Sequence, residues 1–172
     1  MFLAGAAAGC LIAGCAEMTS RPKLKDGEQA IPADYKSWPR FLSGVQRPDA
    51  KQVRDIYVNP VGAGARPSEP FPNGTVFVME NYAAGAKADG SLETGADGKL
   101  VKAGLLRVFV MGKDEGWGES APEGLKNGDW IYSAYLANGD KAPEAIATCR
   151  ACHLPLAAKD FVHRYDEYFR TR

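Results

Sequence analysis

Residues 75–82 read Thr-Val-Phe-Val-Met-Glu-Asn-Tyr and carry the clearest strand signal in the chain. Large apolar side chains occupy both the odd-numbered and the even-numbered positions, so a strand here would meet apolar groups on each face of its sheet. Similar β-branched and aromatic runs occupy residues 52–59, 105–113 and 130–136. Loops rich in glycine and charged residues separate these runs, which predicts an antiparallel sheet.

Helical patterns flank these strand runs. Tyr35, Trp38 and Phe41 recur at helical spacing and predict a short helix before the sheet. Residues 144–152 contain helix formers, and residues 155–169 carry apolar and aromatic groups at helical spacing. The sequence therefore predicts an α+β fold, in which a mainly antiparallel β-sheet is flanked by helices and the chain ends helically.

Length and charge restrict the classes of protein and partner. A chain of 172 residues is long enough for one domain with a sizeable core. Lysine and arginine together number 21, as do aspartate and glutamate, so no field of one sign attracts nucleic acid or an acidic membrane surface. We expect a single domain over residues 34–172 and no nucleic-acid partner.

The amino-terminal residues have the composition of an export signal. Residues 1–14 are almost wholly small or apolar, too few to span a bilayer but sufficient for the core of a signal peptide. Ile12-Ala13-Gly14-Cys15 resembles the bacterial lipobox, which predicts cleavage before Cys15 and lipid attachment to it. An ordinary secretory signal, or cleavage before Cys10, remains an alternative. Residues 15–33 read as a flexible tether, so we expect a periplasmic protein anchored to a membrane by lipid.

The motif with the most specific chemistry lies near the other end of the chain. Cys149-Arg150-Ala151-Cys152-His153 is a Cys-x-x-Cys-His pattern, in which two thiols add to the haem vinyl groups and the histidine reaches the iron. A thioredoxin-like pair would follow a strand, whereas this motif follows a predicted helix. A zinc site would need a further Cys or His cluster, yet beyond this motif only His163 remains once the expected signal, with Cys10 and Cys15, is set aside. A disulfide between the two cysteines would not explain the histidine.

Shorter motifs recur in a characteristic order around the haem motif. They are Tyr35-x-x-Trp38, residues 54–60, residues 71–76, Gly128-Asp129-Trp130 and Phe161-x-x-Arg164-Tyr165. In this order they resemble the cytochrome P-460 family, which includes the cytochromes c′-beta. The resemblance implies a mainly antiparallel sheet with flanking helices, a homodimer, and one haem c whose distal side is open or capped by hydrophobic side chains.

The resemblance also implies two functional groups, which one position separates. Members that oxidise hydroxylamine carry a lysine crosslinked to the haem, in the pattern Gly-Thr-x-x-x-Lys-Glu. Here that pattern reads Gly74 to Glu80 with Met79 in place of the lysine, and no lysine occurs between Lys51 and Lys87. The c′-beta members bind nitric oxide on an uncrosslinked haem. The resemblance therefore favours a binder of nitric oxide or a related small nitrogen species.

Strand parity suggests which side chains would line a distal pocket. Phe77 and Met79 share a face of their strand, as do Arg107, Phe109 and Met111 of theirs. If Met79 faces the haem, as the resemblance implies, Phe77 and Phe109 join it in a dry pocket. The alternative is that these side chains are plain sheet core.

Several roles stay open at this level. Arg54, Arg107 and Arg164 are candidates to pair with haem propionates, because guanidinium suits carboxylates. Met79 is also a candidate sixth ligand, which would give an electron-transfer cytochrome with a redox partner protein. A third reading is hydroxylamine oxidation without the crosslink, which would make the protein an enzyme.

Overall fold

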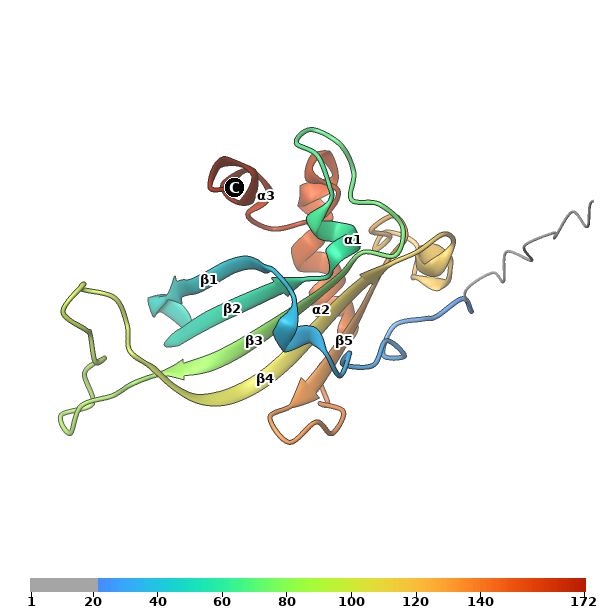
Figure 1. The fold of residues 1–172 in the computed structure, drawn as a ribbon. Helices are drawn as coiled ribbons and strands as arrows, with labels where there is room; N and C mark the ends of the chain where they lie inside the picture. Colours follow the sequence, from blue (N-terminus) through green and yellow to red (C-terminus); the bar gives the residue numbers. More distant parts are fainter. Residues whose placement is uncertain (1–21) are drawn as a thin grey trace, which may run out of the picture.

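A five-stranded antiparallel sheet forms the centre of the protein. The computed structural model describes residues 22–172. The strands follow one another in the sheet in chain order, as Figure 1 shows. They are β1 (Arg40–Arg47), β2 (Gln52–Val58), β3 (Val76–Ala84), β4 (Lys102–Lys113) and β5 (Trp130–Leu136). Each strand pairs with its chain neighbour, as expected when loops join successive antiparallel strands.

Short helices lie around this sheet. The α-helices are α1 (Pro60–Ala63), α2 (Ile146–His153) and α3 (Tyr165–Arg170), and the 3-10 helices are η1 (Tyr35–Ser37), η2 (Pro48–Ala50), η3 (Trp117–Ser120) and η4 (Leu154–Lys159). The predicted α+β fold with C-terminal helices is confirmed. Within residues 22–172 no helix combines the length and the apolar character needed to cross a membrane.

The first strand was not predicted. The helix expected from Tyr35, Trp38 and Phe41 is only the 3-10 turn η1, and Phe41 lies in β1. Residues of β1 do not alternate cleanly, because the register shifts between Leu42 and Val45 where Gly44 takes a positive φ of 62°. A bulge of this kind hides a strand from a search for period-two alternation.

The strand register divides the sheet into two faces. One face, here called the cavity face, carries three cross-strand rows from β2 to β5. The first row is Val58, Phe77, Met111 and Tyr132, the middle row is Ile56, Met79, Phe109 and Ala134, and the rim row is Arg54, Asn81, Arg107 and Leu136. The predicted grouping of Phe77 with Met79, and of Arg107 with Phe109 and Met111, is confirmed.

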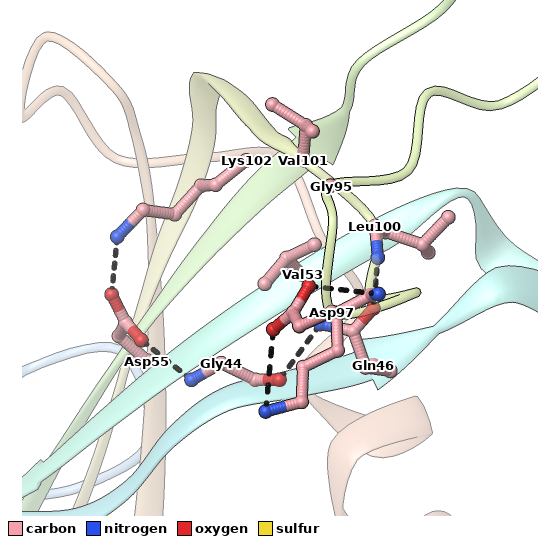
Figure 2. A pocket seen from close by; sticks show the side chains of 10 residues that line it. Gly44, Gln46, Val53, Asp55, Gly95, Asp97, Leu100, Val101 and Lys102 are labelled. Atoms are coloured by element: carbon pink, nitrogen blue, oxygen red, sulfur yellow. Dashed lines mark hydrogen bonds and ion pairs between the residues drawn. The ribbon is translucent and has the colours of Figure 1, made fainter.

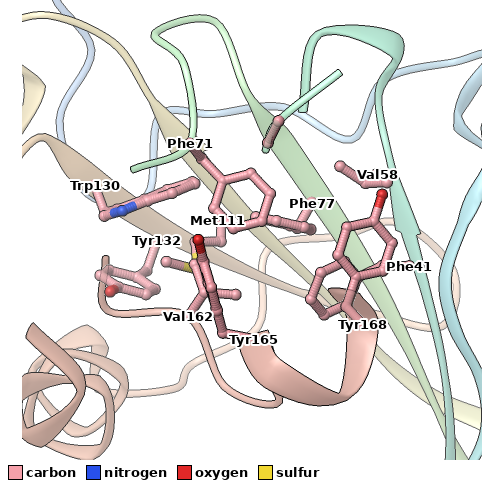
Figure 3. Close-up of a cluster of buried hydrophobic side chains, with 11 residues drawn as sticks. Phe41, Val58, Phe71, Phe77, Met111, Trp130, Tyr132, Val162, Tyr165 and Tyr168 are labelled. Atoms are coloured by element: carbon pink, nitrogen blue, oxygen red, sulfur yellow. The ribbon is translucent and has the colours of Figure 1, made fainter. Parts of the chain in front are cut away.

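The first row forms the hydrophobic core between the sheet and the C-terminal segment. Figure 3 shows its side chains packed among aromatic rings from several elements, and the cluster includes Phe41, Phe71, Trp130, Tyr165 and Tyr168. The Phe71 and Phe77 rings meet edge to face with centroids 5.1 Å apart, and Phe41 stacks on Tyr168 at 4.3 Å. Edge-to-face and stacked contacts of this kind add to the stabilisation from burial alone. The core therefore fixes α3 against the first row.

The opposite face of the sheet, here called the outer face, is covered by the segment around η1. Tyr57, Val78, Val108 and Val110 are buried there against Tyr35.

Glu80 lies in this apolar surface and is only 1% exposed. The hydroxyls of Tyr35, Tyr57 and Tyr82 donate to its carboxylate over 2.8, 3.1 and 2.8 Å, and Lys36 Nζ lies 3.2 Å away. Burial and this carboxylate raise the pKa of Tyr57 to about 12. Each buried polar group of the cluster thus has a partner.

The long connection between β3 and β4 folds back onto the edge of the sheet. Figure 2 shows its contact with β1 and β2, where Leu100 N donates to Gln46 Oε1 over 2.6 Å. Nearby, Asp55 accepts from Gly44 N over 2.9 Å and from Lys102 Nζ over 2.6 Å. These contacts surround a shallow pocket of about 270 Å³.

The segment before η1 is also held against the domain. Asp26 accepts from Tyr132 N over 3.0 Å, and Gly27 N donates to the Tyr132 carbonyl over 2.8 Å. Trp117 Nε1 donates to the carbonyl of Pro22 over 3.2 Å. The segment over residues 22–33 is therefore held by specific contacts and is not the flexible tether expected there, while residues 15–21 of that tether lie outside the described residues. The predicted signal peptide over residues 1–14 and the lipid site Cys15 lie outside the described residues.

Candidate functional site

A cavity of about 500 Å³ lies between the cavity face of the sheet and the C-terminal segment. Volumes of this size are typical of sites for small molecules and cofactors. The sheet wall contributes side chains from β1 to β5, and the opposite wall consists of α2 and residues 162–164. The cavity therefore joins strands from the middle of the chain to the haem motif near its end.

Both cysteines of the motif line this cavity. Cys149 is half-buried, Cys152 is exposed, and both are free thiols. They lie on α2, so that one helical turn separates them and both face the same side. Burial raises the pKa of the Cys149 thiol. The two thiols are thus available on one wall of the cavity, as attachment to two vinyl groups requires.

His153 is the last residue of α2 and lines the same cavity. Its Nδ1 lies 2.7 Å from the carbonyl oxygen of Phe161. A carbonyl can only accept, so Nδ1 carries the proton and Nε2 is left with a free lone pair. Burial lowers the pKa of His153 to about 4, which keeps the imidazole neutral near pH 7. A neutral imidazole with its other nitrogen held by a carbonyl is the form in which histidine binds iron.

The second histidine of the described chain lies beside the first. The ring centroids of His153 and His163 are 4.7 Å apart, and His163 Nε2 lies 3.5 Å from Cys152 Sγ. His163 therefore belongs to the helical wall with the motif, and not to the sheet wall. Burial lowers the pKa of His163 as well. No group of three or more His, Cys, Asp or Glu side chains suited to a metal ion occurs within residues 22–172.

Arg150 occupies the interior of the motif and is 1% exposed. Its guanidinium forms a two-pronged ion pair with Asp26, with Nε to Oδ2 at 2.7 Å and a second contact to Oδ1 at 3.0 Å. It also donates to the carbonyl of Trp130 over 3.1 Å. This buried fork ties α2 to the start of β5 and to the amino-terminal segment. The position of both cysteines thus depends on a residue far away in the sequence.

The sheet wall facing the motif is apolar. Ile56, Met79 and Phe109 of the middle row line the cavity and are only half-buried, although they lie in the interior of the sheet. Phe77, from the first row, also lines it and is buried. The structure thus brings the three predicted distal residues, Phe77, Met79 and Phe109, together opposite the helical wall. Within residues 22–172, no lysine lines this cavity.

Two of the three arginines predicted to contact propionates meet at one edge of the cavity. Arg54 and Arg164 line it. Arg107, which shares the rim row with Arg54, is not among the lining residues and pairs through Nε with Glu144 Oε1. Burial and the nearby positive charges of Arg47 and Arg164 lower the pKa of Arg54. Guanidinium groups that crowd one edge form a site for carboxylates.

Sequence reasoning missed two charged residues of the cavity. Arg47 adds a further guanidinium beside Arg54, and Glu144 brings a carboxylate from the β5–α2 connection. Neither lies in a motif, and neither shares an element with the residues it approaches. Glu144 begins the predicted helical run 144–152 and Arg47 ends the unpredicted strand β1, and no signal in the sequence marked either of them as part of a site.

The residues present fit a haem with propionate groups. Arg54 Nε and Tyr132 OH, which can donate to a carboxylate, are buried without a hydrogen-bond partner in the described part of the chain, and both residues line the cavity. Orphaned polar atoms are rare in a finished core and indicate a missing partner. Each part of haem c has a counterpart in the cavity. The apolar walls suit the porphyrin ring and the two thiols suit its vinyl groups. The neutral imidazole suits the iron, and the guanidinium edge suits the propionates.

Comparison with known proteins supports this assignment. The family model described as Cytochrome P460 matches residues 32–164, which cover the sheet, the haem motif and the wall beyond it. The search of curated proteins finds no matching sequence. Since the match extends over most of the chain and over every wall of the cavity, the protein belongs to the cytochrome P460 family of haem-binding cytochromes.

Proposed function

We propose that the protein is an exported c-type cytochrome whose single haem binds nitric oxide or a related small nitrogen species. Cys149 and Cys152 would hold the haem through two thioethers, and His153 would be its one protein ligand. The haem supplies an iron that binds small ligands, and the chain supplies attachment, orientation and a dry pocket.

One observation carries this proposal. The middle row opposite His153 presents Ile56, Met79 and Phe109, which are half-buried apolar side chains with open cavity before them. Such a wall excludes water and offers no imidazole or amine to the iron. A small neutral ligand therefore meets little competition on this side of the haem.

Optical spectra of the ferric and ferrous protein, with and without nitric oxide and carbon monoxide, test this function. We expect a high-spin haem that takes up nitric oxide in the ferrous state. A low-spin haem that binds neither gas would contradict the proposal.

A second candidate is an electron-transfer cytochrome, because the Met79 side chain lines the cavity from the sheet wall. A thioether bound to the iron would give a six-coordinate haem with a raised potential. In that case Met79→Ala would convert a low-spin spectrum to a high-spin one. An unchanged spectrum in this variant removes the electron-transfer candidate.

A third candidate is oxidation of hydroxylamine without a crosslink. Phe109 offers no proton acceptor, but Glu144 brings a carboxylate with a free oxygen to the cavity. A carboxylate of this kind can accept protons from a bound substrate. Steady-state assay with hydroxylamine and an artificial electron acceptor tests this candidate, and Glu144→Gln should abolish any turnover that is found.

Export and lipid attachment at Cys15 form part of the proposal, because c-type haem is attached outside the cytoplasm. Mass spectrometry of the amino-terminal peptide from membrane fractions tests it. Acylated Cys15 at the new amino terminus is the expected result, and a Cys15→Ser variant should be released from the membrane.

A further inference from the structure

The segment after the haem motif has an unusual backbone. Asp160, Phe161 and Arg164 have φ values of 50°, 59° and 58°, in the left-handed region that side chains other than glycine disfavour. Residues in this conformation persist only where their surroundings hold them, and they gather at functional sites. Three of them within five residues therefore call for a physical restraint.

A buried ion pair supplies that restraint. Lys113 Nζ at the end of β4 lies 3.0 and 2.9 Å from the two carboxylate oxygens of Asp160. Both side chains are nearly buried, with 10% and 12% exposure. Asp160 Oδ2 also accepts from Phe71 N over 2.8 Å. The carboxylate is thus held from two separate elements of the core, and its backbone is fixed with it.

The restrained backbone delivers one functional group to the site. The residue after Asp160 is Phe161, whose carbonyl oxygen lies 2.7 Å from His153 Nδ1. Backbone hydrogen bonds from Phe161 N to the Leu156 carbonyl and from Val162 N to the Lys159 carbonyl, at 2.8 and 3.0 Å, complete the turn. A direct chain of contacts therefore runs from Lys113 through Asp160 and Phe161 to His153.

We propose that Lys113 and Asp160 are positioning residues that hold the Phe161 carbonyl against His153 and so set the donor strength of this imidazole toward the haem iron. This inference rests on the proposed role of His153 as the iron ligand. A carbonyl held firmly on Nδ1 makes Nε2 a stronger donor, which favours the ferric state. A loosened turn weakens the donor and favours the ferrous state.

The decisive variant is Asp160→Asn, studied in the full haem-loaded protein. Asparagine tolerates the left-handed backbone and its one amide oxygen can still accept from Phe71 N, so the change removes the negative charge and one of the two acceptor oxygens that face Lys113. We expect the ratio of ferrous to ferric protein at a fixed potential to rise by roughly tenfold. This corresponds to a rise of about 59 mV in the midpoint potential for one electron. The iron–histidine stretching frequency of the ferrous protein should fall in the same variant.

A matched control and a second variant keep the test sharp. Asp166→Asn breaks the exposed ion pair with Lys159 in the same segment and should change neither the potential nor the stretching frequency. Asp160→Gly serves where Asp160→Asn does not fold, because glycine adopts the left-handed conformation without strain. A haem-loaded variant of either kind with wild-type potential and stretching frequency overturns the assignment, whatever its thermal stability.

Two further outcomes are distinguishable. Loss of covalent haem from both Asp160 variants, while Asp166→Asn retains it, would assign the pair to haem incorporation and likewise overturn the inference. If His153→Ala leaves the iron spectrum unchanged, the proposed ligand itself is wrong. That result would reject the proposed function of His153 independently of Lys113 and Asp160.

Discussion

The two faces of the sheet differ in how fully their buried polar groups are paired. On the outer face, Glu80 and Asp55 are buried carboxylates whose oxygens all have partners. On the cavity side, several buried polar atoms of the described chain have no partner, among them Arg54 Nε, Asn81 Oδ1, Tyr132 OH and Glu144 Oε2, whereas at the outer-face positions of the described strands Ser133 Oγ alone lacks one. The burial of apolar side chains differs as well. Val78 on the outer face is fully buried, whereas its chain neighbour Met79 on the cavity face is only half-buried.

This difference in pairing suggests that the outer face contributes mainly to stability and the cavity face mainly to binding. A satisfied polar cluster within an apolar surface stabilises one arrangement of the chain and offers nothing to a ligand. A surface with half-buried apolar groups and orphaned polar atoms is incomplete until something else covers it. We therefore expect changes on the outer face to alter folding, and changes on the cavity face to alter haem and ligand binding.

The largest effect should follow from removing the attachment thiols. In Cys149→Ser/Cys152→Ser no haem should remain with the polypeptide after denaturation and extraction, because no thioether can form. The far-ultraviolet circular dichroism of the sheet should persist, since the buried residues of the outer face come from the strands and the segment around η1. Haem that survives extraction in this variant would disprove attachment at these two cysteines.

The next largest effect should be on the outer face. Glu80→Ala leaves buried tyrosine hydroxyls without their acceptor, so the free energy of unfolding should fall by about 3 to 5 kcal/mol. Denaturant titration measures this loss. The affinity of the folded protein for nitric oxide should be unchanged. Asp89→Ala, in the exposed β3–β4 connection, is the control and should alter neither quantity.

Adjacent residues on the two faces allow a closer comparison. Val78→Ala should lower the free energy of unfolding by about 2 kcal/mol and leave nitric oxide affinity alone. Met79→Ala removes a larger side chain but should cost less than about 1 kcal/mol, because Met79 is only half-buried. This second variant should instead change nitric oxide affinity by about tenfold. Equal effects of both variants on stability and affinity would break the proposed division.

The pH dependence of stability should also belong to the outer face. Burial by itself raises the pKa of Glu80, but hydrogen bonds from Tyr35 and Tyr82 outweigh it and hold that pKa below its usual range. A depressed pKa stabilises the fold above the unfolded-state value of about 4.3, and this contribution is lost as the pH falls through the folded-state pKa. The stability advantage of the wild type over Glu80→Gln should therefore shrink in acid. A constant difference from pH 7 to pH 3 would contradict this explanation.

The smallest effect should come from the surface. Lys159 and Asp166 form an ion pair 2.6 Å long with both side chains exposed. Lys159→Ala should change the free energy of unfolding by less than about 0.5 kcal/mol and leave ligand affinity unchanged. Denaturant titration and nitric oxide binding in this variant give the baseline against which both faces are compared.

Local patterns in the sequence predicted most of the sheet. Runs of β-branched and aromatic residues identified β2 to β5, and parity placed Phe77, Met79 and Phe109 on one face. The bulge at Gly44 concealed β1, because it interrupts the alternation on which strand prediction depends.

The contacts that complete the site depend on distant parts of the chain. Asp26 lies 124 residues from Arg150, and Lys113 lies 47 residues from Asp160. No local pattern marks such pairs, and for the same reason Arg47 and Glu144 were missed. Arg107 was one of three candidates for a propionate contact, and in the structure it pairs with Glu144; charge alone does not tell which carboxylate an arginine meets.

The ion pair between Asp26 and Arg150 also limits how far the haem site could lie from a membrane. If Cys15 carries a lipid, only eleven peptide units join the bilayer surface to a residue fixed behind the haem motif. At about 3.3 to 3.6 Å per residue, this link reaches at most roughly 40 Å. The site would then stay in a thin layer along the membrane, within reach of membrane-bound redox proteins and of neutral gases dissolved in the lipid.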